Sequence, residues 1–200
     1  MLNRRDAIRT VAFAAGTWLG ETGDAAARGP GGTGDRAPEE YWFSDDGRFP
    51  NNAKYPLLVY RKTGLTAGDP DGVNETFAKN NWTNSWVDGV YPFHHYHSTS
   101  HEVLGVYAGS ALLQIGGPSG KQLRVSAGDV LIIPAGVAHQ CVQRDSEFGV
   151  VGAYPDGRHW DLLRGEPGER PKADQNAAAL PLPELDPVFG AKGPLRQHWR

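Results

Sequence analysis

The sequence predicts an all-β fold, a jelly roll or sandwich of short strands. Short stretches that are apolar or alternate in polarity recur between residues 104 and 153, and turns rich in glycine or proline separate them. The chain has 26 glycine and 15 proline residues among 200, which suits many strands joined by tight turns. This regular spacing favours a sandwich or jelly roll over any fold built from βαβ units.

The expected strands follow from the apolar pattern and the turns between them. Leu57–Tyr60 is a short apolar run that suits a first strand, and the strand pattern resumes beyond Trp86. Turns are expected at 116–120 and 127–129, and Pro134 ends a run that reads as a buried strand. The later strands are expected at 104–107, 112–115, 123–125, 130–133, 140–142 and 148–153.

One short helix is expected before these strands. Asp69 and Pro70 form a starting signal, and Val73 and Phe77 lie four residues apart, on one face of a helix that runs to about Lys79. The tail at 164–200 is rich in proline and charge, so we expect it to be irregular and to pack on the barrel without a core of its own.

The N-terminal region has the features of an export signal. Arg4 and Arg5 form a basic pair, an apolar stretch covers 11–19, and Ala25–Ala27 resembles a cleavage site. This order resembles a twin-arginine signal and predicts a periplasmic or secreted protein; an N-terminal arm retained on a cytoplasmic protein is the alternative. The expected organisation is a signal peptide at 1–27, a flexible linker at 28–40, a β-barrel domain at 41–163 and the tail at 164–200.

Composition excludes several classes of function. The formal net charge of −3 is spread along the chain without a basic run, so no nucleic-acid partner is expected. The single cysteine, Cys141, excludes an internal disulfide and a cysteine-based zinc site. No apolar run reaches the roughly 18 residues needed to span a bilayer, so no membrane association is expected after export.

The segment from His94 to Glu102 contains most of the residues that could carry chemistry. Side chains alternate along a strand, so His95 and His97 should point to one face and His94 to the other. A short turn after His97 would return Glu102 on the neighbouring strand. Two imidazoles and a carboxylate would therefore face the same space.

A fourth candidate ligand comes from later in the chain, where His139 follows the tight turn at 134–136. Three neutral imidazoles and one carboxylate would leave a divalent ion with a net charge of about +1, which still attracts an anion. This mixed nitrogen and oxygen set suits Fe, Mn, Ni, Co or Zn. We therefore predict a transition-metal site made of His95, His97, Glu102 and His139.

These residues resemble the two motifs of the cupin superfamily, the RmlC-like jelly rolls. The first motif is matched by Gly89, His95, His97, Glu102 and Gly109 at every fixed position. The second is matched by the glycine, proline, glycine and histidine at 128, 134, 136 and 139, although Gln143 stands where the family usually has asparagine. The nearest resemblance is to small bacterial single-domain cupins. It implies a jelly-roll barrel, the same four metal ligands and a homodimer.

Other residues near the predicted site allow two interpretations. His94 has the wrong strand parity and His101 lies in the turn, so both are expected at the surface or hydrogen-bonded to a ligand imidazole. Tyr96 points outward and is expected to pack, whereas Cys141 is either a small buried apolar residue or a thiol beside the metal. Four aromatic residues could line a pocket mouth or cap the core: Trp82, Trp86, Tyr91 and Phe93.

The resemblance leaves three functions open, because cupins with this ligand set include dioxygenases, isomerases, decarboxylases and non-catalytic binders. The first is a metal-dependent oxygenase, of dioxygenase type, acting on a small organic substrate. The second is a binding or sensing module that holds a small molecule on the metal without turnover. The third is a cupin isomerase or epimerase that uses a barrel histidine as base.

Overall fold

The computed structural model describes residues 37–65 and 68–200. The predicted signal peptide and the linker up to residue 36 lie outside the described residues. The first described element, β1 (Glu39–Phe43), begins just before Tyr41, where the folded part was expected to start. It pairs with β2 (Asn52–Tyr60), which extends the predicted strand at Leu57–Tyr60 towards the N-terminus.

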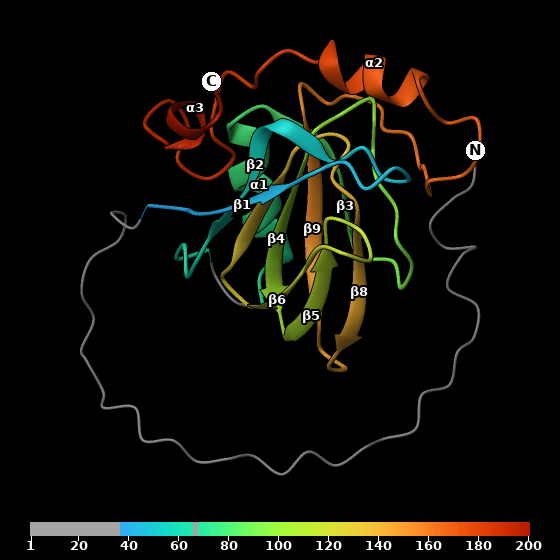
Figure 1. Cartoon of the computed structure of the whole chain (residues 1–200). Helices are drawn as coiled ribbons and strands as arrows, with labels where there is room; N and C mark the ends of the chain where they lie inside the picture. Colours follow the sequence, from blue (N-terminus) through green and yellow to red (C-terminus); the bar gives the residue numbers. More distant parts are fainter. Residues whose placement is uncertain (1–36, 66–67) are drawn as a thin grey trace. The chain divides into compact units, whose positions relative to one another are not determined.

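The strands of the described residues form two antiparallel sheets (Figure 1). The larger sheet has the strand order β1-β2-β7-β4-β9-β3, and the smaller sheet has the order β6-β5-β8. The remaining strands are β3 (Trp82–Asp88), β4 (Glu102–Ala108), β5 (Ser110–Ile115), β6 (Lys121–Ser126), β7 (Val130–Ile133), β8 (His139–Arg144) and β9 (Gly149–Pro155). The predicted all-β fold of jelly-roll type is confirmed.

The main core lies between the two sheets. Alternate residues of β4 and β7, among them Leu104 and Leu131, face residues of the smaller sheet such as Leu113 and Val125. Cys141 of β8 belongs to this apolar cluster, where burial raises the pKa of its thiol. The cysteine is therefore a small buried apolar residue, one of its two predicted roles.

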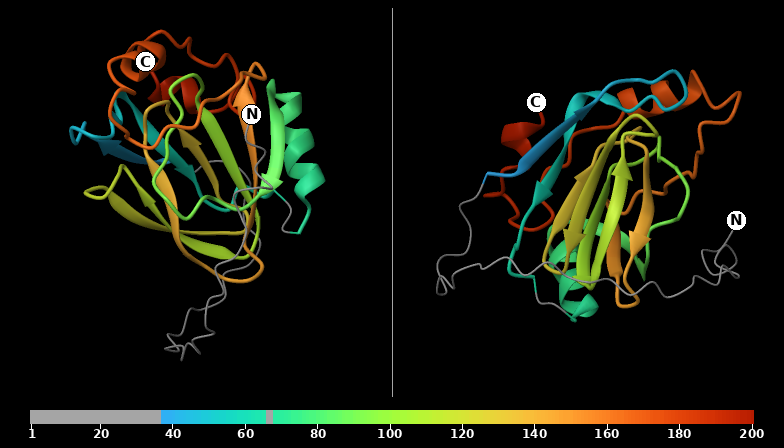
Figure 2. Two further views of the ribbon diagram at one scale, coloured as in Figure 1. Left: turned by 90° about the vertical axis from the view of Figure 1, so that its right-hand side faces the viewer. Right: turned by 60° about the horizontal axis from the view of Figure 1, so that its bottom comes forward.

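A second core covers the outer face of the larger sheet. The predicted helix is confirmed as α1 (Pro70–Lys79), with Asp69 accepting a hydrogen bond from the Gly72 amide at its start. Val73 and Phe77 of this helix are buried against the sheet, and Gly105 of β4 provides the space, because a Cβ there would lie 2.8 Å from both side chains. Figure 2 shows α1 lying along the sheet.

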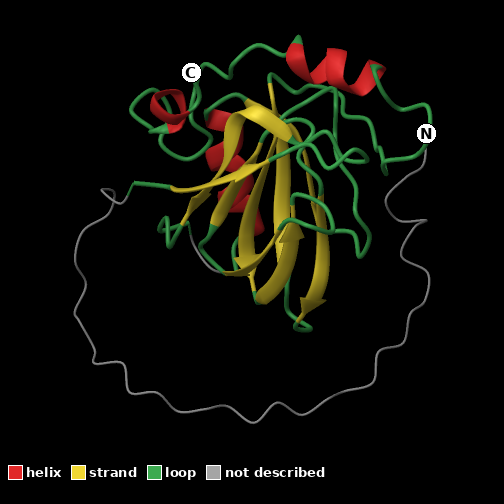
Figure 3. Ribbon diagram, viewed as in Figure 1, coloured by secondary structure: helices red, strands yellow, loops and turns green. Residues whose placement is uncertain are grey.

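The C-terminal tail is more ordered than its composition suggests. It contains two short helices, α2 (Lys172–Ala178) and α3 (Leu195–His198), which Figure 3 shows outside the strands. Leu195 and Trp199 are fully buried in the second core, and the Trp199 indole donates a hydrogen bond to the carbonyl of Pro56. These contacts join residues far apart in the sequence, so no local pattern predicts them.

Candidate metal centre

The candidate site lies at one end of the core between the two sheets, where several strands begin or end. β4 begins at Glu102 and pairs there with Ile133, the last residue of β7. β8 begins at His139, which pairs with Ile115, the last residue of β5. The antiparallel order of the strands therefore brings Glu102 and His139 to the same end of the core.

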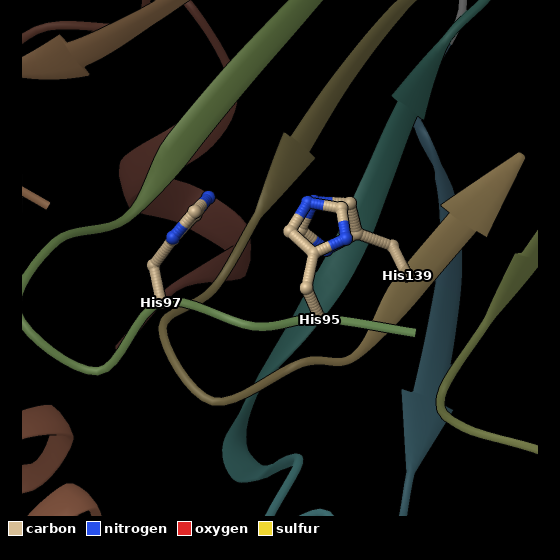
Figure 4. A group of neighbouring side chains, drawn as sticks. All are labelled: His95, His97 and His139. Atoms are coloured by element: carbon tan, nitrogen blue, oxygen red, sulfur yellow. The ribbon is translucent and has the colours of Figure 1, made fainter. Parts of the chain in front are cut away.

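His95 and His97 lie on an extended segment and not on a regular strand, which corrects the prediction. His95 exchanges two backbone hydrogen bonds with His139, at 3.1 and 2.9 Å, and Tyr96 exchanges two with Leu163, at 2.9 and 3.0 Å. The alternation that a strand would give is kept all the same. Figure 4 shows His95 and His97 rising from the same side of this segment towards His139.

The turn before β8 places His139 against the histidine segment. Gly136 has a φ of +91°, and a Cβ there would lie 2.4 Å from the Asn51 carbonyl oxygen, so only glycine fits without strain. The Gly136 amide donates to the carbonyl of His97 at 2.9 Å. The predicted tight turn before His139 is therefore hydrogen-bonded to His97, and the side chains of both histidines reach the site.

The four predicted ligands converge. One ring nitrogen each from His95, His97 and His139 lies within 4.8 Å of the others. Glu102 Oε2 lies 3.2 Å from His139 Nε2 and 3.6 Å from His97 Nε2. Each of the four residues is at most 3% exposed. The arrangement brings three imidazoles and a carboxylate together out of contact with bulk water.

Hydrogen bonds to backbone carbonyls define which nitrogen each imidazole presents. Nδ1 of His95 faces the carbonyl of Phe93 and Nδ1 of His139 faces that of Val137, each at 3.1 Å, while Nδ1 of His97 faces the carbonyl of Asp161. A carbonyl oxygen can only accept, so each neutral ring must carry its proton on Nδ1. All three Nε2 atoms are then unprotonated lone-pair donors.

Two atoms in the cluster lack the hydrogen bonds that buried polar atoms normally make. Among the described residues, nothing hydrogen-bonds to His97 Nε2 or to Glu102 Oε2, although both atoms are buried. The other carboxylate oxygen, Glu102 Oε1, accepts a hydrogen bond of 2.9 Å from the Tyr154 hydroxyl. The two unsatisfied atoms face one another, as ligands of a shared cation would.

Tyr154 was not predicted as a site residue, and it is connected in turn to Trp86. The Trp86 indole nitrogen donates to the Tyr154 hydroxyl at 2.8 Å. Gly152 gives the indole its place, because a Cβ on that residue would lie 2.0 Å from a Trp86 ring carbon. A tyrosine at the end of the apolar run 150–153 was the sequence signal that could have identified this residue.

Burial and neighbouring charge act on the pKa values of the cluster. Burial, together with His139 and His97 nearby, lowers the pKa of His95 well below its ordinary value, so this imidazole is neutral at physiological pH. Burial disfavours the charged form of Glu102, whereas the pKa of that carboxyl is held well below its ordinary value while His97 and His139 carry a second proton and donate it to the carboxylate. A carboxylate beside a neutral imidazole is the protonation state that a metal site requires.

The neighbouring histidines lie elsewhere. His94 packs near Phe49, with ring centroids 5.4 Å apart, as its predicted parity requires. His101 is buried, which corrects the expected surface position: its Nδ1 accepts from the Ala135 amide and its ring lies 4.8 Å from Trp199. Burial lowers the pKa of His101 to about 3, so it is a neutral packing residue.

Of the four aromatic residues, Trp82 and Trp86 pack in or against the cores, whereas Tyr91 and Phe93 lie beside the histidines. Trp82 is buried in the outer core and donates to the carbonyl of Leu185. Tyr91 and Phe93 stack on one another and lie beside His95, with ring centroids 5.0 and 5.8 Å from its imidazole. Tyr96 packs against Phe49 and is fully buried, as its parity predicted.

No helix among the described residues is long and apolar enough to cross a membrane.

Low similarity to solved structures is found over about half of the chain. A DUF861 family protein from Thermotoga maritima is 17% identical, with a TM-score of 0.33 over 48% of this chain and 96% of that protein. Acireductone dioxygenase from Bacillus anthracis, with a cadmium ion in its active centre, is 14% identical, with a TM-score of 0.36 over 52% and 80%.

Known protein sequences resemble this chain more closely than the solved structures above do. Residues 87–151, which include all four predicted ligands, match the family described as Cupin domain. A Bacillus subtilis (strain 168) protein described as uncharacterized protein YjlB is 38% identical over 165 residues, covering 82% of this chain and 98% of the relative. The motifs, the two facing sheets and these matches show that the chain belongs to the cupin superfamily.

Proposed function

We propose that the protein binds one divalent transition metal through His95, His97, Glu102 and His139 and uses it to bind and oxygenate a small organic molecule. The observation that carries the proposal is the shared orientation of the three imidazoles. Each has Nδ1 against a backbone carbonyl, the three rings lie close together, and Nε2 of His97 and His139 faces the buried carboxylate. Fixing the tautomer in this way is how proteins prepare histidines as metal ligands.

The chemistry of the donor set fits a metal. A hydrogen-bonded cluster would satisfy the buried atoms of His97 and Glu102, whereas these atoms lack partners among the described residues. Leaving such atoms unsatisfied is costly unless another group, such as a cation, takes the place of the hydrogen bond. The mixed imidazole and carboxylate ligands suit Fe, Mn, Ni, Co or Zn.

The charge of the site favours an anionic ligand. A divalent ion there would supply Lewis-acid or oxygen-activating chemistry. Glu102 neutralises one of its two charges, and His95 is neutral, so the centre keeps a net charge of about +1. Tyr91 and Phe93 pack beside His95, so the surroundings of this charge are partly apolar. A small carboxylate is the ligand class that this combination favours.

Metal analysis of the purified protein and calorimetric titration of the metal-free protein test the proposal. We expect one equivalent of metal per chain and a loss of affinity of at least about 100-fold in His97→Ala. His94→Ala is the matched control, because it removes a histidine of the same segment that faces away, and it should bind as the wild type does. Equal binding by His97→Ala, or no binding of any of the five metals by the wild type, would refute the site.

A non-catalytic binding or sensing protein is the second candidate, and one observation favours it. An enzyme would need a further acid or base near the metal, but the other ionisable residues close to the predicted ligands in the sequence, His94, His101 and Cys141, lie in other packing environments. Oxygen-uptake assays with each metal and a panel of small carboxylates separate the candidates. Turnover supports the oxygenase, whereas a rise in melting temperature without turnover, seen only with metal present, supports the binder.

We also propose that the chain is exported through its twin-arginine segment and acts as a homodimer. Export after folding would allow metal loading in the cytoplasm, before contact with more competitive copper and zinc. Changing Arg4 and Arg5 to Lys should leave the protein in the cytoplasm, and an unchanged location would reject the export proposal.

Light scattering of the purified protein tests the proposed homodimer. A mass of twice the chain mass would support the dimer, and a mass equal to that of one chain would reject it.

A further inference from the structure

A segment that follows β9 lies against the histidine segment. Residues 159–163, here called the Asp161 segment, are held by backbone hydrogen bonds between Leu163 and Tyr96 in both directions. At its other end, the Thr99 hydroxyl lies 3.1 Å from the carbonyl of His159 and accepts from the Asp161 amide at 3.0 Å. The segment is therefore attached on both sides of His97.

The Asp161 carboxylate makes the most concentrated of these contacts. Its Oδ1 accepts from the Ser98 amide at 2.6 Å and from the Thr99 amide at 3.3 Å. Its Oδ2 accepts from the Ser98 hydroxyl at 2.5 Å. Ser98 is fully buried, so the carboxylate satisfies polar groups that water does not reach.

The backbone carbonyl of the same residue accepts the Nδ1 proton of His97. This bond differs from those of the other two imidazoles. His95 and His139 bond to carbonyls of residues two positions earlier in their own segments. His97 alone of the three depends on a segment more than 60 residues away in the sequence, which also packs Trp160 against its ring at a centroid distance of 5.1 Å.

We propose that Asp161 is a positioning residue for His97. Its carboxylate holds the Asp161 segment on Ser98 and Thr99, and its carbonyl thereby fixes His97 with the proton on Nδ1 and with Nε2 facing Glu102. The effect on metal affinity rests on the proposed function. The effect on the tautomer of His97 does not, because it belongs to the metal-free protein.

The test compares Asp161→Ala with Asp145→Ala. Asp145 makes the same kind of clamp far from the site, accepting from the Ser110 amide at 2.7 Å and from the Ser110 hydroxyl at 2.8 Å. One readout is the nitrogen-15 NMR spectrum of the imidazoles in metal-free protein, which distinguishes Nδ1-protonated from Nε2-protonated rings. The second readout is metal affinity by calorimetry.

We expect Asp161→Ala to give a mixture of tautomers at His97 alone, with His95 and His139 unchanged, and to weaken metal binding about 10- to 100-fold. Asp145→Ala should change neither the tautomers nor the affinity. Asp161→Asn keeps an oxygen that can accept from the Ser98 amide, so it should retain part of the wild-type tautomer preference and metal affinity. This variant also serves as the test if the alanine variant does not fold.

The possible failures are distinguishable. If the wild type binds no metal but Asp161→Ala still alters the tautomer of His97, the metal site is wrong and the positioning role stands. If the wild type binds metal while Asp161→Ala and Asp161→Asn leave both tautomer and affinity unchanged, the positioning role is wrong. An equal loss of affinity in Asp145→Ala would show that the effect is one of general stability and would also overturn the proposal.

Discussion

Two buried carboxylates, Asp186 and Glu102, have opposite surroundings. Asp186 accepts from the Tyr60 hydroxyl at 2.6 Å, from the Leu195 amide, and from the amides of Val188 and Phe189. Both of its oxygens are thus satisfied by groups that hold the C-terminal tail. Both residues are at most 2% exposed, so burial does not distinguish them.

Only one carboxylate oxygen of Glu102 accepts a hydrogen bond within the described part of the chain. Oε1 accepts from Tyr154, while Oε2 faces the Nε2 atoms of His97 and His139. Those nitrogens are lone-pair donors because their rings carry the proton on Nδ1, so they cannot donate to the carboxylate. The difference separates a carboxylate whose oxygens are both satisfied within the fold from one with an oxygen left for the proposed metal.

The largest expected effect is on stability, at the satisfied carboxylate. Asp186→Ala leaves the Tyr60 hydroxyl and three amide groups without their acceptor, which should lower the free energy of unfolding by about 3 kcal/mol or more. Denaturant unfolding of the metal-free protein measures this loss. Metal affinity at 25 °C should stay within about twofold of the wild type, and a large loss of affinity would mean that the two regions are coupled.

The second prediction is the reverse of the first: a loss of metal affinity without a loss of stability. Glu102→Gln should weaken metal binding at least about 100-fold, or about 2.8 kcal/mol, because it removes the one anionic ligand. At pH 8, where imidazoles are ordinarily neutral, the metal-free variant should be no less stable than the wild type, since a buried charge is removed and the new amide can donate to His139. A loss of stability without a loss of metal affinity would make Glu102 a structural residue like Asp186.

A smaller effect is expected from the tyrosine that holds Glu102. Tyr154→Phe removes the hydrogen bond to Oε1 and should weaken metal binding about tenfold, or about 1.4 kcal/mol. Tyr60→Phe is the matched control, because it removes the corresponding hydroxyl from Asp186. That variant should lower stability by about 1 kcal/mol and leave metal affinity unchanged.

The sequence predicted the parts of the site that depend on local pattern. Side-chain alternation placed His95 and His97 on one face, and the turn at Gly136 brought His139 beside them. The strands between 102 and 155 were also predicted, because their residues alternate towards a common core.

The rest depends on pairings between distant residues. The edge strands β1 and β3 were missed, since polar or exposed residues such as Glu40, Trp42 and Asn84 interrupt their apolar pattern. Tyr154 and Asp161 reach the site from more than 50 residues away in the sequence. Their roles depend on hydrogen-bond partners that periodicity and spacing do not identify.

The most direct test is a crystal structure of the metal-loaded protein, with anomalous diffraction recorded at the absorption edge of the bound metal. The account predicts one anomalous peak per chain, within about 2.0–2.2 Å of the three Nε2 atoms and of Glu102 Oε2, the distances usual for zinc and similar ions. A peak elsewhere on the protein, or a centre bound by the histidines with Glu102 turned away, would contradict it.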